Sequence, residues 1–216
     1  MAKLLMLFGL LFIACGNVEG SWNSGSSPSE SDSSSSGAVS SSSGCLEDFV
    51  NWQVPPEHSY VHGSTDITLS PYLISANLIT QGQYKAIMGE SPSIGENNDM
   101  LPVEGVTWHK AAEFCRKLSA QMCLGSETIK LPTEAQWEYA INAIQIIDGY
   151  WEWTNDCFGP FPASQHDPSP VDCSDNFERV VKGTHNLEYR IGIHPDSYNM
   201  GNSIGAGYIS FRIVKK

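Results

Sequence analysis

A serine-rich segment near the N-terminus limits what this chain of 216 residues can fold into. Of the 24 residues from Ser21 to Gly44, 14 are serine. Such a segment has almost no apolar side chains to bury, so nothing offsets the conformational entropy that folding would cost. We therefore expect residues 15–44 to form a disordered tether. The remaining residues, 45–216, suffice for one domain with a single hydrophobic core.

The residues before the tether are typical of an export signal. Lys3 provides a positive charge, and the apolar run from Leu4 to Ala14 is too short to span a bilayer. Because Cys15 follows this run directly, the segment resembles a bacterial lipobox, in which the cysteine is lipidated. We expect residues 1–14 to be a lipoprotein signal peptide and the lipid on Cys15 to anchor the protein to a membrane. An ordinary secretory peptide cleaved nearby is the alternative.

The residue after Cys15 indicates the membrane in which the protein is anchored, and the net charge of the chain excludes one class of binding partner. Gly16, next to the expected lipidation site, does not resemble an inner-membrane retention signal, so the outer membrane or the cell surface is favoured. The chain has 24 acidic against 12 basic residues, a net charge of −12. Binding to nucleic acid usually requires a basic patch, so we expect no nucleic-acid partner.

Three threonines mark the starts of three predicted helices. Thr80 and Thr133 are each followed three residues later by glutamine, the pattern of a capping box. Thr107 precedes a stretch, up to Met122, in which apolar residues recur at helical spacing. We expect Gly89 to end the first helix, and the third to continue to Ile144.

The predicted strands lie before and after these helices. Alternating apolar residues indicate a strand over 67–78, bent at Pro71, and further strands at 150–154, 179–182 and 208–214. A long loop rich in Pro, Asp and Ser separates the strand at 150–154 from the strand at 179–182. Helices followed by irregular β structure predict an α+β fold with a high loop content.

Several segments together resemble one family. The most specific of them reads Leu-Pro-Thr-Glu-Ala-Gln-Trp-Glu-Tyr-Ala, and the segments are Ile79–Tyr84, Leu101–Trp108, Lys130–Ala140, Trp151–Asp156 and the closing stretch Gly207–Val214. They are similar to the formylglycine-generating enzyme, or sulfatase-modifying-factor, family. The resemblance covers residues 60–214 and implies a loop-rich, C-type-lectin-like domain with two or three short helices and irregular antiparallel β structure.

The resemblance is weaker at the catalytic centre of that family. Its oxidase members bind copper(I) through a C-terminal cysteine pair and oxidise a substrate cysteine. Here Ile191 and Ile193 stand where the thiols would be needed, and no cysteine follows Cys173. We therefore expect a shortened, catalytically degenerate member with no copper. A copper-dependent formylglycine-generating oxidase that acts on a sulfatase cysteine is the alternative.

Candidate metal ligands are few. Family members carry an insert with calcium ligands that this chain lacks, which leaves Glu152 with Asn155 or Asp156 as a weak calcium set. His58 and His62 have the i, i+4 spacing of a metal pair, but they lie between prolines and a glycine, so we interpret them as surface loop residues. We expect no cofactor, and calcium is the alternative.

The cysteines of an exported protein should mostly be paired. Cys157 and Cys173 bracket the long loop and are predicted to form a disulfide. Cys115 and Cys123 are a weaker candidate pair, since Cys115 lies on the core face of a helix and suits a buried thiol. Cys45 is then the cysteine expected to be unpaired.

The long loop offers the main candidate for ligand binding. Phe158 and Phe161 are aromatic, and His166 and Asp167 are polar, a mixture that suits contact with a sugar ring or a peptide. A loop with a purely structural role is the alternative. We thus expect a cell-envelope lipoprotein that binds protein or polysaccharide as an assembly module, and a purely structural envelope protein is a further alternative.

Overall fold

The computed structural model describes most of the predicted domain. The described residues are 45–46, 48–55, 60–124, 128–141, 143–161, 163–168, 177–183, 190–199 and 208–216. The elements, in chain order, are β1 (Trp52–Gln53), β2 (Tyr60–His62), β3 (Thr65–Ile67), β4 (Leu73–Ser75), α1 (Gln81–Met88), α2 (Trp108–Gln121), β5 (Ile129–Lys130), α3 (Glu134–Ala140), β6 (Tyr150–Cys157), β7 (Arg179–Gly183), β8 (Arg190–Ile193), β9 (Tyr208–Phe211) and β10 (Val214–Lys215). The predicted signal peptide and tether lie outside the described residues.

The three helices begin at the predicted threonines. Thr80 and Thr133 form capping boxes, and the Thr107 side chain accepts a hydrogen bond from the third residue after it. Gly89 ends α1 in the left-handed conformation, at φ 88°, which a glycine adopts without steric cost. The expected continuation of α3 to Ile144 is wrong, because the helix ends at Ala140. Ile144 is nevertheless buried, in a small hydrophobic cluster beside α3.

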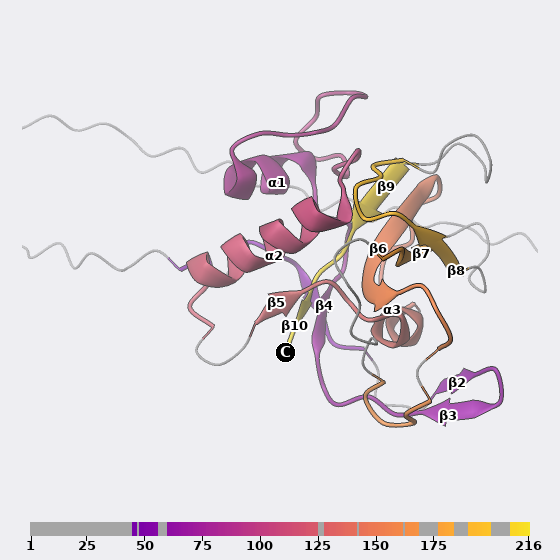
Figure 1. Ribbon diagram of the computed structural model, residues 1–216. Coiled ribbons are helices and arrows are strands. Elements are labelled where there is room, and N and C mark those ends of the chain that lie inside the picture. The colour runs from indigo at the N-terminus through magenta and orange to yellow at the C-terminus, as the bar shows by residue number, and fades with distance from the viewer. Residues whose placement is uncertain are drawn as a thin grey trace, which may run out of the picture. The chain divides into compact units, whose positions relative to one another are not determined.

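Two four-stranded sheets and a hairpin form the β structure (Figure 1). The first sheet has the order β1-β4-β10-β5 and is antiparallel throughout. The second has the order β8-β7-β6-β9, in which β9 runs parallel to β6 and the other pairs are antiparallel. Within the described part of the chain, strands β2 and β3 pair only with each other. The predicted α+β fold is therefore confirmed.

The predicted strand over 208–214 is divided between the two sheets. β9 belongs to the second sheet and β10 to the first, and the chain crosses between them at Arg212 and Ile213. Ser75 fixes the crossing, because its N–H donates to the Ile213 carbonyl and its hydroxyl accepts from the Ile213 N–H. The uninterrupted apolar alternation concealed this break, since the side chains on both sides of it are buried.

The main hydrophobic core lies between the α1–α2 layer and the sheets. Aromatic rings from three elements meet there: the Tyr84 ring stacks on Phe114, and Phe114 meets Phe211 edge to face. Trp153, fully buried on β6, donates from its indole nitrogen to the Val106 carbonyl at 2.8 Å. These contacts attach α1 and α2 to β9, and the segment before α2 to β6, in the second sheet.

Candidate functional site

The aromatic residues of the predicted binding loop are occupied by contacts within the domain. The Phe161 ring stacks on the imidazole of His62, with 3.6 Å between ring centroids. The guanidinium carbon of Arg190 lies 5.5 Å from the centroid of Phe158, whose exposed fraction is 39%. Both rings therefore cover polar or charged side chains of the same chain.

The polar residues of the same loop are bonded to the segment between β3 and β4. His166 Nδ1 lies 2.8 Å from the hydroxyl of Thr68. The Asp167 carboxylate accepts a hydrogen bond from the Ser70 N–H at 2.8 Å and pairs with Lys216 Nζ at 3.3 Å. Asp167 also has a positive φ of 42°, which no other non-glycine residue of the described segments shares. It lines a pocket that neither phenylalanine lines.

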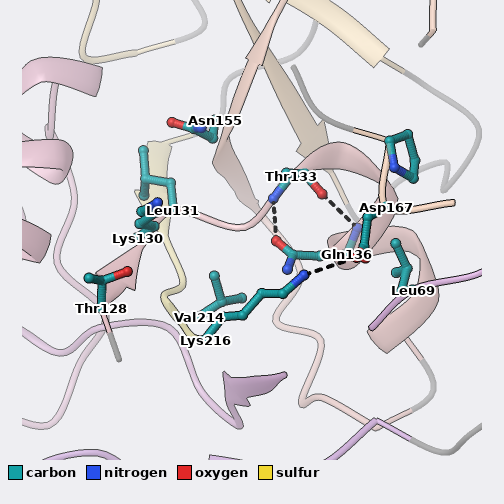
Figure 2. Close-up of a pocket in the computed structure, with 11 residues that line it drawn as sticks. Leu69, Thr128, Lys130, Leu131, Thr133, Gln136, Asn155, Asp167, Val214 and Lys216 are labelled. Atoms are coloured by element: carbon teal, nitrogen blue, oxygen red, sulfur yellow. Dashed lines mark hydrogen bonds and ion pairs between the residues drawn. The ribbon is translucent and has the colours of Figure 1, made fainter. Parts of the chain in front are cut away.

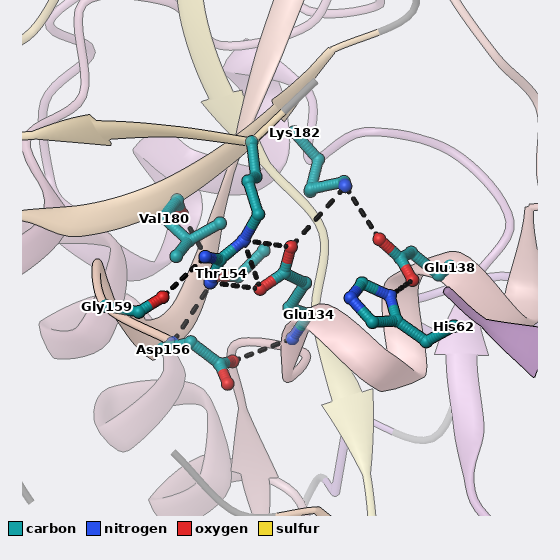
Figure 3. Close-up of polar contacts among 9 residues, drawn as sticks. His62, Glu134, Glu138, Thr154, Asp156, Gly159, Val180 and Lys182 are labelled. Carbon is teal, nitrogen blue, oxygen red and sulfur yellow. Dashed lines mark hydrogen bonds and ion pairs between the residues drawn. The ribbon is translucent and has the colours of Figure 1, made fainter. Parts of the chain in front are cut away.

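Four charged residues behind this loop form a buried ion cluster (Figure 3). Glu134 and Glu138 come from successive turns of α3, Lys182 from β7 and Arg190 from β8. Lys182 Nζ lies 2.7 Å from Glu138 Oε1 and 3.5 Å from Glu134 Oε1, and Arg190 donates to both Glu134 oxygens at 2.8–3.1 Å. The side chains of Lys182 and Glu134 are 1% and 0% exposed. The cluster thus balances two negative charges with two positive ones, and its centre at Lys182 and Glu134 is shielded from water.

Two titratable side chains extend the ion cluster. His62 Nδ1 lies 2.9 Å from the second oxygen of Glu138, so the prediction that His62 is a surface loop residue is wrong: it sits on β2 and joins the hairpin to α3. At the other end, Asp156 Oδ2 accepts the Glu134 N–H at 2.7 Å. Burial raises the pKa of Asp156 to about 7, with the nearby Glu134 charge adding to the rise, although that N–H hydrogen bond opposes it.

The ion cluster was not predicted from the sequence. One signal was present: Lys182 follows two valines in a segment with the pattern of a buried strand, where an unpaired lysine would be costly. A second was the spacing of Glu134 and Glu138, which places both carboxylates on one side of a helix. Matching the two required knowing that β7 lies beside α3, which no local pattern reveals.

The predicted calcium ligands have separate partners. Glu152 is 1% exposed, and its carboxylate accepts hydrogen bonds from Arg212 at 2.8 and 3.1 Å and from the Trp137 indole at 2.8 Å. The Asp156 carboxylate accepts the backbone N–H of Glu134 at the start of α3, and the Asn155 side chain lines a pocket near β5. Among the described residues, no group of three or more His, Cys, Asp or Glu is placed to hold a metal ion. The donor set does not fit a calcium cage of six or more oxygens.

The cysteines are paired differently from the expectation. Cys45 forms a disulfide with Cys123, across 78 positions of sequence, so the expectation that Cys45 is unpaired is wrong, as is the candidate pair of Cys115 with Cys123. Cys115 is a free, buried thiol whose pKa is raised by burial. Cys157 is disulfide-bonded, while its predicted partner Cys173 lies outside the described residues.

These cysteines do not fit the copper site of the oxidase family. Two thiolates close together are the ligands that copper(I) prefers. Ile191 and Ile193 occupy the matching positions on β8 and pack against the main core. Cys115 is enclosed in α2 with no second free thiol among the described residues.

Two adjacent hollows follow β5, and we call them together the β5 groove. The first, the cationic hollow, has a volume of about 250 Å³ and is shown in Figure 2. Its walls are Leu69, Thr128, Lys130, Leu131, Thr133, Gln136, Asn155, Asp167, Pro168, Val214 and Lys216. The second, the apolar hollow, has a volume of about 350 Å³. Its walls are Ala112, Cys115, Arg116, Ser119, Thr128, Ile129, Lys130, Leu131 and Asn155.

A third hollow lies beside the ion cluster. It has a volume of about 420 Å³ and is lined by the β2–β3 hairpin, including Tyr60 and His62, and by Trp137, Glu138 and Ile141 of the α3 region. The Tyr60 hydroxyl is buried there without a hydrogen-bond partner among the described residues. Burial and the charge of Glu138 raise the Tyr60 pKa, so the phenol stays protonated at neutral pH.

Comparison with known proteins agrees with the motifs. Residues 54–150 match the family model described as the sulfatase-modifying factor enzyme 1-like domain. This stretch of the chain is therefore similar to that domain, as its motifs predict. The curated chaperone protein LppX of Paenibacillus barcinonensis is 29% identical over 136 residues, which cover 44% of this chain and 48% of that protein. The chain thus spans about half the length of this relative.

Solved structures share the fold at low sequence identity. Treponema denticola variable protein 1 is 18% identical, with a TM-score of 0.56, over 76% of this chain and 94% of that one. CarF is 13% identical, with a TM-score of 0.55, over 76% and 97% of the two chains. PvdO from Pseudomonas aeruginosa is 14% identical, with a TM-score of 0.51, over 77% and 92%. These likenesses concern the fold alone.

Proposed function

We propose that this chain is a cell-envelope lipoprotein whose sulfatase-modifying-factor-like domain is catalytically degenerate and binds another protein as a chaperone or assembly module. The ion cluster carries the proposal. Glu134, Glu138, Lys182 and Arg190 bond to one another, so the charges in the centre of the domain act as a rigid support rather than as reagents. The relative named as a chaperone supports the choice of a protein partner.

The loop contacts favour a protein over a polysaccharide. Recognition of a sugar by stacking requires an aromatic face that is free to receive the ring. The Phe161 ring is stacked on His62, and the Phe158 ring lies against Arg190. Polypeptide recognition has no such requirement, and open hollows lined by mixed side chains suit it.

The anchor is part of the same proposal. No helix in the described part of the chain is long and apolar enough to cross a membrane. We infer attachment through a lipid on Cys15, with residues 15–44 as a tether and the outer membrane or cell surface as the location. Mass spectrometry of the N-terminal peptide should find an acylated Cys15, and a Cys15→Ser variant should leave the membrane fraction. An unmodified peptide would contradict the anchor.

One experiment separates binding from oxidation. The full chain, purified in detergent, is incubated with copper(I), oxygen and a sulfatase-type cysteine peptide, and mass spectrometry monitors conversion to formylglycine. In parallel, light scattering monitors aggregation of a denatured secreted enzyme diluted into buffer with or without an equimolar amount of the chain. We expect no formylglycine and reduced aggregation. Turnover above a metal-free control would show the oxidase instead, and unchanged aggregation would contradict the chaperone role.

A further inference from the structure

The two hollows of the β5 groove adjoin each other. Thr128, Lys130, Leu131 and Asn155 line both, so these four residues are their shared wall. Figure 2 shows Lys130, Leu131 and Asn155 on the side of the cationic hollow opposite Asp167, while Thr128 is bonded through its backbone to Lys216. A molecule that lies across this shared wall reaches both hollows.

The chemistry of the groove changes along its length. The apolar hollow is walled by Ala112 and Cys115 of α2 together with Ile129 of β5, and Arg116 and Lys130 also line it. The cationic hollow is flanked by Lys130 and by Lys216, whose ammonium is partly neutralised by Asp167. The groove therefore offers a site for an apolar group beside a site for an acidic one.

Two of the three groove cations have no acidic partner among the described residues, which is unusual in so acidic a protein. The net charge of the chain is −12, yet neither Lys130 nor Arg116 has an acidic partner among the described residues. The carboxamide of Asn155, between the hollows, likewise makes no side-chain hydrogen bond within the described part of the structure. An acidic group with hydrogen-bonding capacity would complement all three side chains.

The backbone of β5 is not free to pair with an added strand, which limits how a polypeptide can bind. β5 is an edge strand of the first sheet, but Ser119 Oγ accepts the outward-facing Ile129 N–H at 2.8 Å. This contact occupies the backbone group that an added strand would need. Recognition must therefore proceed through side chains, with one entering each hollow.

We infer that the β5 groove binds an extended polypeptide segment in which an apolar side chain lies beside an acidic one. The inference rests on the proposed function, since it names the feature of the partner protein that this domain would recognise. The apolar side chain enters the hollow walled by Ala112 and Cys115. The acidic side chain lies between Lys130 and Asn155.

The test uses the full chain and four fluorescent, end-blocked nonapeptides. The parent has a central Leu-Ser-Asp, and the others replace Asp by Asn, Asp by Lys, or Leu by Ser. Fluorescence anisotropy should show the Asp peptide binding about five-fold tighter than the Lys peptide, as one partly exposed ion pair allows. Loss of the Leu should weaken binding similarly. Equal affinities for all four peptides would overturn the inference.

Matched variants locate the site. Lys130→Glu should reverse the preference, so that the Lys peptide binds better, whereas Lys85→Glu makes the same charge change on α1 and should leave the order unchanged. Ala112→Phe should fill the apolar hollow and weaken the parent peptide about ten-fold. Ala120→Phe, exposed on the same helix, should not. Circular dichroism verifies that each variant folds, and reversal by Lys85→Glu as well would overturn the assignment.

A fatty acid and the aggregation assay separate a peptide site in the groove from a lipid site and from the chaperone role. If dodecanoate binds more tightly than the parent peptide, and if this binding is lost in the Lys130→Glu variant, the groove is a lipid site. This result would overturn the proposal that its ligand is a polypeptide. If the chain suppresses client aggregation while the peptides bind without preference, the groove assignment fails and the proposed function stands. If the peptides bind in the expected order but aggregation is unchanged, the groove assignment stands and the chaperone role fails.

Discussion

The charged side chains of the ion cluster are buried and paired, whereas those of the β5 groove are exposed to solvent. In the ion cluster, Lys182 is bonded to two glutamates and is shielded from water. In the groove, Lys130 is exposed and has no acidic partner among the described residues. A buried charge must be neutralised within the fold, whereas an exposed cation can remain available to a ligand. The paired charges of the ion cluster therefore stabilise the fold, and the unpaired cations of the groove suit ligand binding.

Removal of the Lys182 ammonium should have the largest effect. Lys182→Met leaves Glu138 and Glu134 with less compensation in a buried setting, so we expect the free energy of unfolding to fall by about 3–5 kcal/mol. Urea denaturation monitored by tryptophan fluorescence measures it. Lys130→Met, the same substitution in the groove, should change the free energy by less than about 0.5 kcal/mol. Equal losses in the two variants would erase the proposed contrast.

The pH dependence of stability should depend on Asp156. Its carboxyl loses its proton near pH 3.8 when unfolded but near 7 when folded, because it is buried. Between these values the unfolded state binds fewer protons, so the contribution of Asp156 to stability is complete below pH 4 and is lost as the pH rises towards 7. The loss should amount to roughly 2–4 kcal/mol. Asp156→Asn should abolish it.

Urea denaturation at several pH values between 4 and 8 tests the Asp156 prediction. The variant should gain stability relative to the parent chain as the pH rises, since asparagine does not ionise and still keeps an oxygen that can accept the Glu134 N–H. Parallel curves for the two proteins would show that Asp156 titrates with an ordinary pKa.

The cap of α3 joins the two regions and should have an intermediate effect. The Thr133 hydroxyl accepts the Gln136 N–H, and both residues also line the cationic hollow. Thr133→Ala should lower the free energy of unfolding by about 1 kcal/mol, the usual cost of an N-cap. Thr128→Ala, in the groove but outside any helix, serves as the control in thermal denaturation. A similar loss for both would mean that the groove wall, rather than the cap, is responsible.

Neutralising the groove should affect stability least. Arg116→Gln with Lys130→Gln removes two exposed cations that have no described partner, so we expect a change below about 0.5 kcal/mol. Urea denaturation of the double variant measures it, and its affinity for the acidic peptide should fall at the same time. A clear loss of stability would indicate that the two cations are structural, like Lys182.

The sequence predicted local features of the fold well and long-range ones poorly. The starts of α1, α2 and α3 followed from Thr80, Thr107 and Thr133, because a cap and the spacing after it lie within a few residues. The short strands β2, β5 and β8 gave too little periodicity to be recognised. The division of 208–214 between two sheets depends on contacts with Ser75, far away in the sequence.

The candidate sites show the same limit. Phe158, Phe161, His166 and Asp167 were selected because aromatic and polar residues in a loop suit binding, but whether a ring is free depends on distant partners such as His62 and Arg190. The β5 groove escaped notice because its walls come from α2, β5, β6 and β10. No single stretch of sequence contains the pattern that the assembled side chains make.

The position of β10 has a consequence for the order in which this domain assembles. β10 lies between β4 and β5 and bonds to both, while Ile213, just before it, is held by Ser75 from 138 positions earlier. During synthesis, β4 and β5 therefore remain without this partner strand until residues 214–215 have been made. Since such distant pairing is slow to form, the first sheet should be the last part of the domain to close. Until then β4 and β5 lack the strand that joins them in the finished sheet.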